Sequence, residues 1–272
     1  MTFKPGTAGH LIGIDVGGTG IKGGIVNVAS GTLAGPSIRM ETPRPATPSA
    51  VAAVVSILVA ALEDMPGCPR SSQPVGITFP GIVQNGIARS AANVDSSWIG
   101  VDAAAVFSAG LQRDVVVLND ADAAGLAEAT CGAGRGIPGT VLVITLGTGI
   151  GSALVFDGKL VPNAELGHLA IDGFAAEIAA SAVARERDGI TWAEYSVRLQ
   201  RYFSHLEFIF SPELFVVGGG ISACTDLYLP LLNLRSPIVA ARLQNEAGII
   251  GAALAAGEPA PAPPLPASLL PT

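Results

Sequence analysis

Long hydrophobic runs are missing from this chain of 272 residues, although 49% of its residues are hydrophobic. The longest run, VAAVVSILVAAL at 51–62, is interrupted by Ser56 and falls well short of the roughly 20 apolar residues that cross a bilayer. The opening MTFKPGTAGH also lacks the apolar core of a secretory signal. We therefore expect a cytoplasmic protein with no membrane partner.

Cysteine and basic residues are also scarce. The three cysteines, Cys68, Cys131 and Cys224, are far apart and form no C-x-x-C pair, which argues against a disulfide framework and against structural zinc. Lys and Arg number 15 against 22 Asp and Glu, giving a net charge of −7. This balance disfavours nucleic acid as a partner, because it leaves no broad basic face.

Glycine, in contrast, is concentrated in LIGIDVGGTGIKGG at 11–24. Gly18–Gly23 satisfies G-x-G-x-x-G, but that pattern indicates a dinucleotide site only where a helix follows. Branched residues and further glycines follow here, and they favour a strand. The stretch therefore predicts strand, turn and strand, and it lacks the helix on which a Rossmann fold binds pyrophosphate.

The glycine-rich pattern occurs a second time in the chain. The segment ITLGTGIGSALV at 144–155 resembles IDVGGTGIKGGIV at 14–26 after one deletion. The two copies are about one domain length apart, which predicts two similar lobes. Backbone N–H groups in such turns can hold phosphate, since glycine permits close approach and positive φ. Glycine turns can also be purely structural, but the repetition favours phosphate.

The remaining pattern alternates strands with helices, which is typical of the α/β class. Thr47 and Pro48 form a helix-start signal. Strands are expected at 11–16, 21–28, 75–79, 115–118, 140–146, 151–156 and 213–217, and helices at 48–63, 103–109, 121–131, 175–187, 192–209 and 246–256.

Two acidic residues follow apolar strands directly. Asp15 precedes the first glycine turn, where a carboxylate beside a phosphate calls for a cation such as Mg²⁺. Asp120 follows VVVLN, and strand ends in α/β folds bind ligands, so it could accept a proton from an attacking hydroxyl. The alternatives are a local turn role for Asp15, and a helix N-cap at Asp120 or Asp122.

Two further segments, SAANVDSSW at 90–98 and NAELGHLAIDGFAAE at 163–177, offer groups of the kind that bind sugar hydroxyls. Each group taken singly is more typical of a surface or structural residue. The candidates are Asn93, Asp95, Trp98, Glu165, His168 and Glu177.

Five motifs, DVGGTGIKGG, NDADAAG, TLGTGIG, ELGH and LFVVGGGIS, resemble in order and spacing those of the ROK sugar kinases. The resemblance runs from residue 11 to about 256, and TFPGIV, AANVDSSWIG and LVPNAELGHL resemble more narrowly the polyphosphate glucokinases. It implies a two-lobed, actin-like (ribonuclease H-like) α/β ATPase fold with a central cleft. It also implies phosphoryl transfer from polyphosphate, and from ATP, to the 6-hydroxyl of glucose, with mannose as a further acceptor.

The resemblance also implies residue roles. Asp120 is similar to the catalytic base of the family. The matching sugar ligands are Asn93, Asn119, Asp120, Glu165, His168 and Glu177. The matching phosphate and Mg²⁺ elements are Asp15, which would hold the ion through water, and Gly17, Gly18, Thr19, Gly20, Lys22, Thr148 and Gly149. The adenosine-side motif corresponds to Gly218, Gly219 and Gly220.

The expected division is a first lobe at 1–119 completed by a helix at 245–257, a second lobe at 120–244, and a disordered Pro/Ala-rich tail at 258–272. A homodimer is also expected. Many ROK proteins carry zinc-binding cysteines after Gly-His, but none stands between His168 and Glu177, so we expect no zinc.

Two alternatives stay open on the sequence. An ATP-only hexose kinase would keep the fold and the sugar site. A non-catalytic sugar sensor would resemble the ROK repressors, which carry a DNA-binding motif for which DVGGTG, starting at Asp15, leaves no room. Polyphosphate would need a track of cations, and with three lysines it must rely largely on arginine. Candidates for this track are Lys22, Arg135, Lys159, Arg185 and Arg187.

Overall fold

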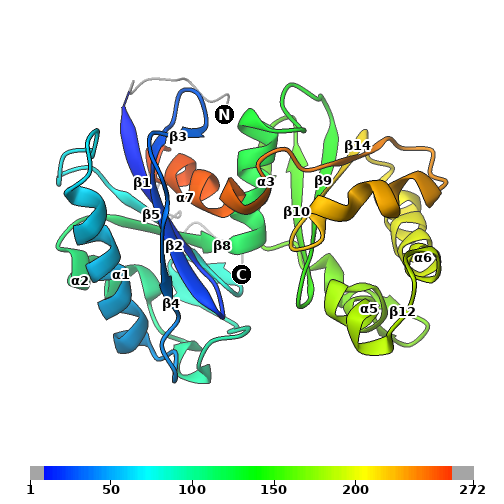
Figure 1. Cartoon of the computed structure of the whole chain (residues 1–272), viewed down its shortest axis with the longest axis horizontal. Coiled ribbons are helices and arrows are strands. Elements are labelled where there is room, and N and C mark those ends of the chain that lie inside the picture. The colour runs from blue at the N-terminus through cyan, green and yellow to red at the C-terminus, as the bar shows by residue number, and fades with distance from the viewer. Residues whose placement is uncertain (1–8, 259–272) are drawn as a thin grey trace, which may run out of the picture.

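Two β-sheets with helices between and around them form the molecule (Figure 1). The computed structural model describes residues 9–258. The first sheet has the order β3-β2-β1-β5-β8, with β4 also paired to β2, and the second has the order β11-β10-β9-β14-β15. This arrangement confirms the expected two-lobed α/β fold. We call each sheet with the helices that cover it a lobe.

The elements follow the chain in this order. The first sheet comprises β1 (His10–Val16), β2 (Gly20–Asn27), β3 (Thr32–Leu33), β4 (Ile38–Glu41), β5 (Val75–Phe79) and β8 (Val115–Asn119). The second comprises β9 (Thr140–Leu146), β10 (Ile150–Phe156), β11 (Lys159–Val161), β14 (Leu214–Gly218) and β15 (Ile238–Ala240). Two small hairpins are β6 (Val83–Gln84) with β7 (Ile87–Ala88), and β12 (Ala170–Ile171) with β13 (Phe174–Ala175).

The helices lie between and outside the sheets. They are α1 (Pro48–Glu63), α2 (Ala103–Leu111), α3 (Asp120–Cys131), α4 (Glu177–Ala180), α5 (Ala182–Asp188), α6 (Trp192–Phe210) and α7 (Ala247–Gly257). Short 3₁₀ turns are η1 (Ser96–Trp98), η2 (Leu166–His168), η3 (Ser222–Leu227), η4 (Leu229–Leu231) and η5 (Gln244–Glu246).

Both lobes repeat one topology. In the first, β1 is antiparallel to β2 and parallel to β5, which is parallel to β8. In the second, β9 is antiparallel to β10 and parallel to β14, which is parallel to β15. The predicted strand–turn–strand units at both glycine motifs are therefore confirmed.

Helices α7 and α3 form the layer between the sheets, where Figure 1 shows them side by side. Helix α7 lies directly on the first sheet, because β1 and β5 present glycines to it. A Cβ atom at Gly13 would lie 1.9 Å from the Ile249 carbonyl oxygen, and one at Gly76 would lie 1.7 Å from that of Ala252. Helix α3 covers β9 and β10 of the second sheet.

The outer faces are covered by α1 and α2 on the first sheet and by α6 on the second. The predicted start of α1 is confirmed: the Thr47 side chain accepts a hydrogen bond from the Ala50 N–H, and Pro48 is the first helical residue. Trp98 is fully buried between Phe79 and Phe107 in this core. No helix within residues 9–258 is long and apolar enough to cross a bilayer.

One predicted helix, 175–187, is wrong as a single element. Ala175 ends β13, and the later residues form α4 and α5. The two helices are separated at Ser181, whose ψ of 161° is extended and whose hydroxyl accepts a hydrogen bond from the Ala184 N–H. Short strands such as β4 and β15 were not predicted, since two to four residues carry little periodicity. The expected tail lies outside the described residues from 259 onward.

Candidate active site

Asp120 begins α3 at the point where the first sheet ends. The N-cap of this helix is Asn119, whose Oδ1 accepts hydrogen bonds from the N–H groups of Ala121 and Asp122 at 2.8 and 3.0 Å. The Asn119 Nδ2 donates to the Gly81 carbonyl at 3.1 Å. The suggested cap at Asp120 or Asp122 is therefore wrong. Asn119 uses both ends of its amide to fix the start of the helix.

The Asp120 carboxyl is accessible to solvent, but its surroundings disfavour the ionised form. The side chain is exposed to the cleft, but protein atoms surround it closely. This desolvation, together with the negative charge of Asp15 and more weakly that of Glu165, raises the pKa of Asp120 to about 7. Solvent access moderates the shift but does not reverse its direction. A carboxyl that titrates near neutral pH suits general base catalysis.

Asp15 is held rigidly at the end of β1. Its cross-strand neighbour on β5 is Thr78, whose hydroxyl donates to Asp15 Oδ1 at 2.8 Å and accepts from the Val16 N–H at 3.0 Å. The carboxyl also abuts the start of α7, since a Cβ atom at Gly248 would lie 2.8 Å from its Cγ. Sequence reasoning missed Thr78, because only the pairing of β1 with β5 brings it to Asp15.

The first glycine turn connects β1 to β2. It is closed by a hydrogen bond from the Gly17 N–H to the Gly20 carbonyl at 3.0 Å. None of Gly17, Gly18 and Gly20 has a φ in the left-handed region, so this turn does not use the positive φ that glycine permits. At position 20 a Cβ atom would lie 2.6 Å from Arg39 Nη2, so a side chain there would displace the Arg39 guanidinium rather than the backbone.

The second turn, between β9 and β10, lies under Glu177. The turn is closed by a hydrogen bond from the Gly147 N–H to the Gly149 carbonyl at 3.0 Å. Glu177 Oε2 accepts from the Ile150 N–H at 3.2 Å, and a Cβ atom at Gly149 would lie 2.5 Å from this oxygen. The other Glu177 oxygen, Oε1, is 3.5 Å from Nε2 of the exposed His168.

The predicted adenosine-side glycines begin at the last residue of β14, Gly218, and lie next to the second turn. Gly218 pairs with Thr145 in register. A Cβ atom at Gly219, whose φ is +88°, would lie 2.4 Å from the Leu146 carbonyl oxygen. This segment therefore belongs to the second lobe, and it lies at the same end of the second sheet as Thr148.

A cavity of about 450 Å³ joins the two turns. Its lining includes Gly18 and Thr19 of the first turn, Thr148 of the second, and the loop residues Arg44, Asn93 and Asp95. Of these, Arg44 was not among the residues predicted from the sequence. The structure thus brings the candidate sugar ligand Asn93 to the phosphate-side turn.

Asn163 ties the segment that carries Glu165 to both lobes. Its side chain accepts from the Val83 N–H and donates to the Val83 carbonyl, each at 3.0 Å. Its backbone N–H donates to Asp122 Oδ2 at 2.7 Å. Burial raises the pKa of Asp122 to about 6, and the charge of Glu165 contributes a smaller increase. Sequence reasoning missed this role of Asn163, which depends on contacts between distant segments.

Two residues of the 90–98 segment have structural roles. The Trp98 indole is buried and donates through Nε1 to the Ala46 carbonyl at 3.0 Å, so it is unavailable to a sugar. Asp95 caps η1 by accepting from the Ser97 N–H at 2.9 Å. Hydrogen bonds with Ser97 hold the Asp95 pKa below its usual value.

Two of the cations proposed for a polyphosphate track, Lys159 and Arg135, lie away from the second turn. Lys159 pairs with Phe156 at the end of β10 that is opposite the second turn. Arg135 follows the C-terminus of α3, a helix of 12 residues that spans about 18 Å from Asp120. Arg185 stacks on Trp192 at 3.7 Å, and Arg187 is paired with Asp188. For Lys159 and Arg135, nearness to the motifs in sequence was misleading. Arg185 and Arg187 lie on α5, whose Val183 N–H donates to the Gly147 carbonyl of the second turn at 3.2 Å, so their part in a track stays a prediction.

Within residues 9–258, no three His, Cys, Asp or Glu side chains gather into a cluster that could hold a metal ion. A magnesium ion bound by phosphate, water and one or two carboxylates requires no such cluster.

The fold is the actin-like ATPase fold of sugar kinases. It is recognised by two lobes of the same topology, two helices between their sheets, and carboxylates at the cleft. The model of the ROK family matches residues 11–186, and the chain belongs to this family. A polyphosphate glucokinase from Mycobacterium tuberculosis (strain CDC 1551 / Oshkosh) is 47% identical over 250 residues, covering 92% of each chain.

Solved structures extend this similarity. An inorganic polyphosphate/ATP-glucomannokinase from Arthrobacter sp. strain KM is 65% identical with a TM-score of 0.88, covering 92% of this chain and 98% of the other. A ROK family glucokinase from Streptomyces griseus, solved with glucose and AMPPNP, is 26% identical with a TM-score of 0.75, covering 90% and 98%.

Proposed function

We propose that this protein is a kinase that transfers the terminal phosphoryl group of inorganic polyphosphate, and of ATP, to the 6-hydroxyl of glucose. The observation that carries the proposal is Asp120, a carboxyl with a pKa of about 7 that faces the cleft near Asp15. The similarity to polyphosphate glucokinases and to a polyphosphate/ATP-glucomannokinase supports both donors and glucose.

In this mechanism, Asp120 accepts the proton of the 6-hydroxyl as its oxygen attacks the terminal phosphorus in line. The bond from that phosphorus to the bridging oxygen breaks, and the shortened polyphosphate or ADP leaves with the electron pair. The capped start of α3 fixes the position of Asp120, so the reacting atoms meet without a large entropic cost. Asn93, Glu165, His168 and Glu177 are the proposed ligands of the sugar hydroxyls.

Mg²⁺ fits the residues of the first lobe. Thr78 fixes Asp15 through Oδ1, while Oδ2 accepts no hydrogen bond from residues 9–258. The charge of Asp15 also acts unfavourably on ionised Asp120, and a cation between the donor and Asp15 would relieve this repulsion. We therefore propose that Asp15 holds Mg²⁺ through water. When bound, the ion neutralises charge on the donor phosphates.

Further parts of the proposal concern the acceptor and the nucleotide. The turn at Gly18–Gly20 and residues Thr148 and Gly149 would contact donor phosphates, and Gly218–Gly220 the adenosine of ATP. Mannose is proposed as a second acceptor because a glucomannokinase is among the similar structures. We propose no zinc, since His168 approaches Glu177 and no cysteine lies between them in the chain.

The test is formation of glucose 6-phosphate with Mg²⁺ and either purified polyphosphate or ATP as the sole donor. Turnover with both donors is expected. Turnover with ATP alone would exclude polyphosphate as a donor and retain a hexose kinase. Absence of turnover with either donor, in protein that binds glucose by calorimetry, would indicate a sugar sensor instead.

A further inference from the structure

The strand register places a row of polar side chains across the first sheet. Asp15 on β1 pairs with Lys22 on β2, and Lys22 pairs with Arg39 on β4. Paired residues in antiparallel strands point to the same face, and their Cβ atoms are about 5 Å apart. Two strand spacings, about 10 Å, therefore separate Asp15 from Arg39. The row begins at the reacting centre and ends at an exposed arginine.

In this row the cations Lys22 and Arg39 lie directly opposite each other on neighbouring strands. Like charges at paired positions destabilise a sheet unless an anion lies between them. Among residues 9–258, the ion pairs include none to Lys22, Arg39 or Arg44. Asp15, opposite Lys22 in register, accepts a hydrogen bond from Thr78 rather than forming an ion pair with Lys22. Within residues 9–258 no ion pair therefore offsets the repulsion between Lys22 and Arg39, which indicates a place for an external anion beside Arg39.

Arg39 is oriented by the turn itself. Its Nη2 donates to the Thr19 carbonyl at 3.2 Å, and its guanidinium lies against the backbone of Gly20. A guanidinium has five N–H donors, so this contact leaves most of them free for phosphate oxygens. Arg39 is therefore a fixed cation beside the donor turn.

Arg44 lies in the cavity beside the same turn. It lines the cavity with Gly18 and Thr19, and the segment before it is attached to the turn by a hydrogen bond from Thr42 Oγ1 to the Gly17 carbonyl. Asp95, also on the cavity wall, is an acid whose Oδ1 accepts from the Ser97 N–H and which forms no ion pair with Arg44 among residues 9–258. Glu41, opposite Gly20 in register, is a further exposed acid near the turn.

We propose that Lys22, Arg39 and Arg44 bind the phosphates of a polyphosphate chain that lie beyond the transferred end. This inference rests on the proposed function and assigns the site where the length of the donor is recognised. The three cations belong to the first lobe, whereas Gly218–Gly220 belong to the second. An adenosine would therefore leave the turn in a different direction, so the cluster discriminates polyphosphate from ATP. It also allows a chain with a net charge of −7 to bind a polyanion through a local cluster.

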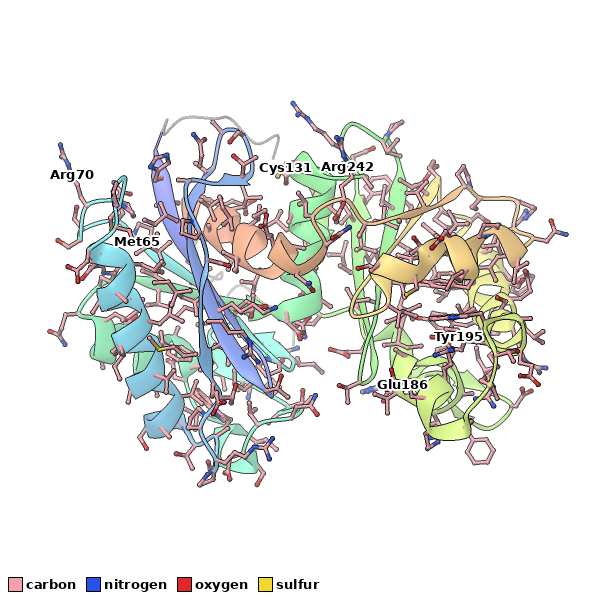
Figure 2. The ribbon with its side chains drawn as sticks, viewed as in Figure 1. Met65, Arg70, Cys131, Glu186, Tyr195 and Arg242 are labelled. Atoms are coloured by element: carbon pink, nitrogen blue, oxygen red, sulfur yellow. The ribbon has the colours of Figure 1, made fainter. Side chains whose placement is uncertain are left out.

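The experiment compares Arg39→Ala and Arg44→Ala with Arg70→Ala, an exposed arginine that Figure 2 shows at the outer edge of the first lobe. Initial rates are measured with long-chain polyphosphate, tripolyphosphate and ATP. We expect KM for long-chain polyphosphate to rise about tenfold or more in both test variants, the scale of a lost charge-assisted contact. KM for ATP should change less than threefold, tripolyphosphate should be intermediate, and Arg70→Ala should match wild type.

A second readout is the dependence of polyphosphate KM on salt. Binding of a polyanion releases counterions, so each lost cationic contact lowers the slope of log KM against log salt. We expect shallower slopes for Arg39→Ala and Arg44→Ala, and an unchanged slope for Arg70→Ala. Arg39→Lys keeps the charge and should retain most of the slope.

The outcomes separate this inference from the proposed function. Wild-type enzyme without polyphosphate turnover would overturn both. Wild-type turnover with an unchanged ratio of polyphosphate to ATP efficiency in the two variants would overturn the cation cluster alone. An equal loss for both donors would show that Arg39 merely supports the turn. If Arg39→Ala lowers the melting temperature, the result with Arg44→Ala decides between the two explanations, because the Arg44 side chain forms no hydrogen bond or ion pair within residues 9–258.

Discussion

The two glycine turns have the same backbone plan but are covered by side chains of opposite charge. In the first lobe Arg39 lies over Gly20, and in the second lobe Glu177 lies over the corresponding Gly149. The strand pairs differ in the same sense: Asp15 pairs with Lys22, whereas Thr145 pairs with Gly151. The first turn is thus set among charged groups, and the second presents small neutral residues beside one carboxylate.

This difference shows that a glycine turn is a scaffold whose chemistry depends on what covers it. A guanidinium over the turn favours an anion such as phosphate, while a carboxylate favours the hydroxyl groups of a sugar. Glu177 also occupies the Ile150 N–H, which is therefore unavailable to phosphate. We infer that the first lobe contributes most to donor binding and the second most to acceptor binding.

Asp120 lies where the two functions meet, and its removal is expected to have the largest effect. Asp120→Ala should lower kcat by about 10²–10⁴-fold with either donor, because the base is lost, while glucose affinity changes little. The measurement combines glucose 6-phosphate formation with calorimetric glucose binding. Asp64→Ala, at an exposed site after α1, is the matched control. Near-normal turnover in Asp120→Ala would refute the assignment.

The corresponding positions Asp15 and Thr145 test the asymmetry directly. Asp15→Asn should lower kcat by about 10²–10³-fold, the scale of one lost electrostatic contribution to the transition state, and should raise the Mg²⁺ concentration needed for half-maximal rate. Thr145→Ala should change kcat by less than about tenfold, because this position carries no charge. Similar losses in both variants would mean that the lobes share the metal function.

The two covered glycines should separate donor from acceptor. Gly20→Ala displaces the flexible end of Arg39, and Gly149→Ala displaces that of Glu177, so the backbone can stay in place. We expect Gly20→Ala to raise KM for polyphosphate about three- to tenfold, and Gly149→Ala to raise KM for glucose by a similar factor, each a partial loss of one charged contact. Steady-state kinetics with each substrate varied would show the pattern, and exchanged effects would contradict it.

The smallest expected effect concerns stability and pH. Asp120 has a folded-state pKa of about 7 and a model value of 3.8, so the native protein retains a proton that the unfolded chain releases between these values. The contribution of Asp120 to the free energy of unfolding therefore falls as pH rises from about 4 to 7. Asp120→Asn, which cannot ionise, should exceed wild type in stability by on the order of 1 kcal/mol above pH 7, after allowance for solvent access. Urea unfolding at pH 5 and pH 8 measures this, and an equal difference at both values would exclude it.

The sequence was sufficient for those parts of the fold that local chemistry determines. The hairpins follow from strand-forming residues around glycine turns, and α1 begins where Thr47 and Pro48 indicate. The break at Ser181 was missed because alanine-rich flanks favour a continuous helix. Such a break depends on packing rather than on propensity.

The sequence identified candidate residues at the site better than it identified their neighbours. Asp15 was apparent as a strand-end carboxylate, but Thr78 and Arg39 reach the site only through strand pairing across long chain separations. Lys159 was misassigned for the converse reason, since a few residues along a strand carry a side chain to the far end of a sheet. Cross-strand register is therefore the information that one sequence does not provide.

Helix α7 has a consequence for the order in which the chain can fold during synthesis. The glycines of β1 and β5 that meet this helix are made first, and residues 247–257 are made after the strands of both sheets. The strands of both sheets are therefore synthesised before the inner face of the first sheet receives its cover. The lobe whose strands leave the ribosome first is thus completed after the second sheet, although Thr78 can hold Asp15 as soon as β5 pairs with β1.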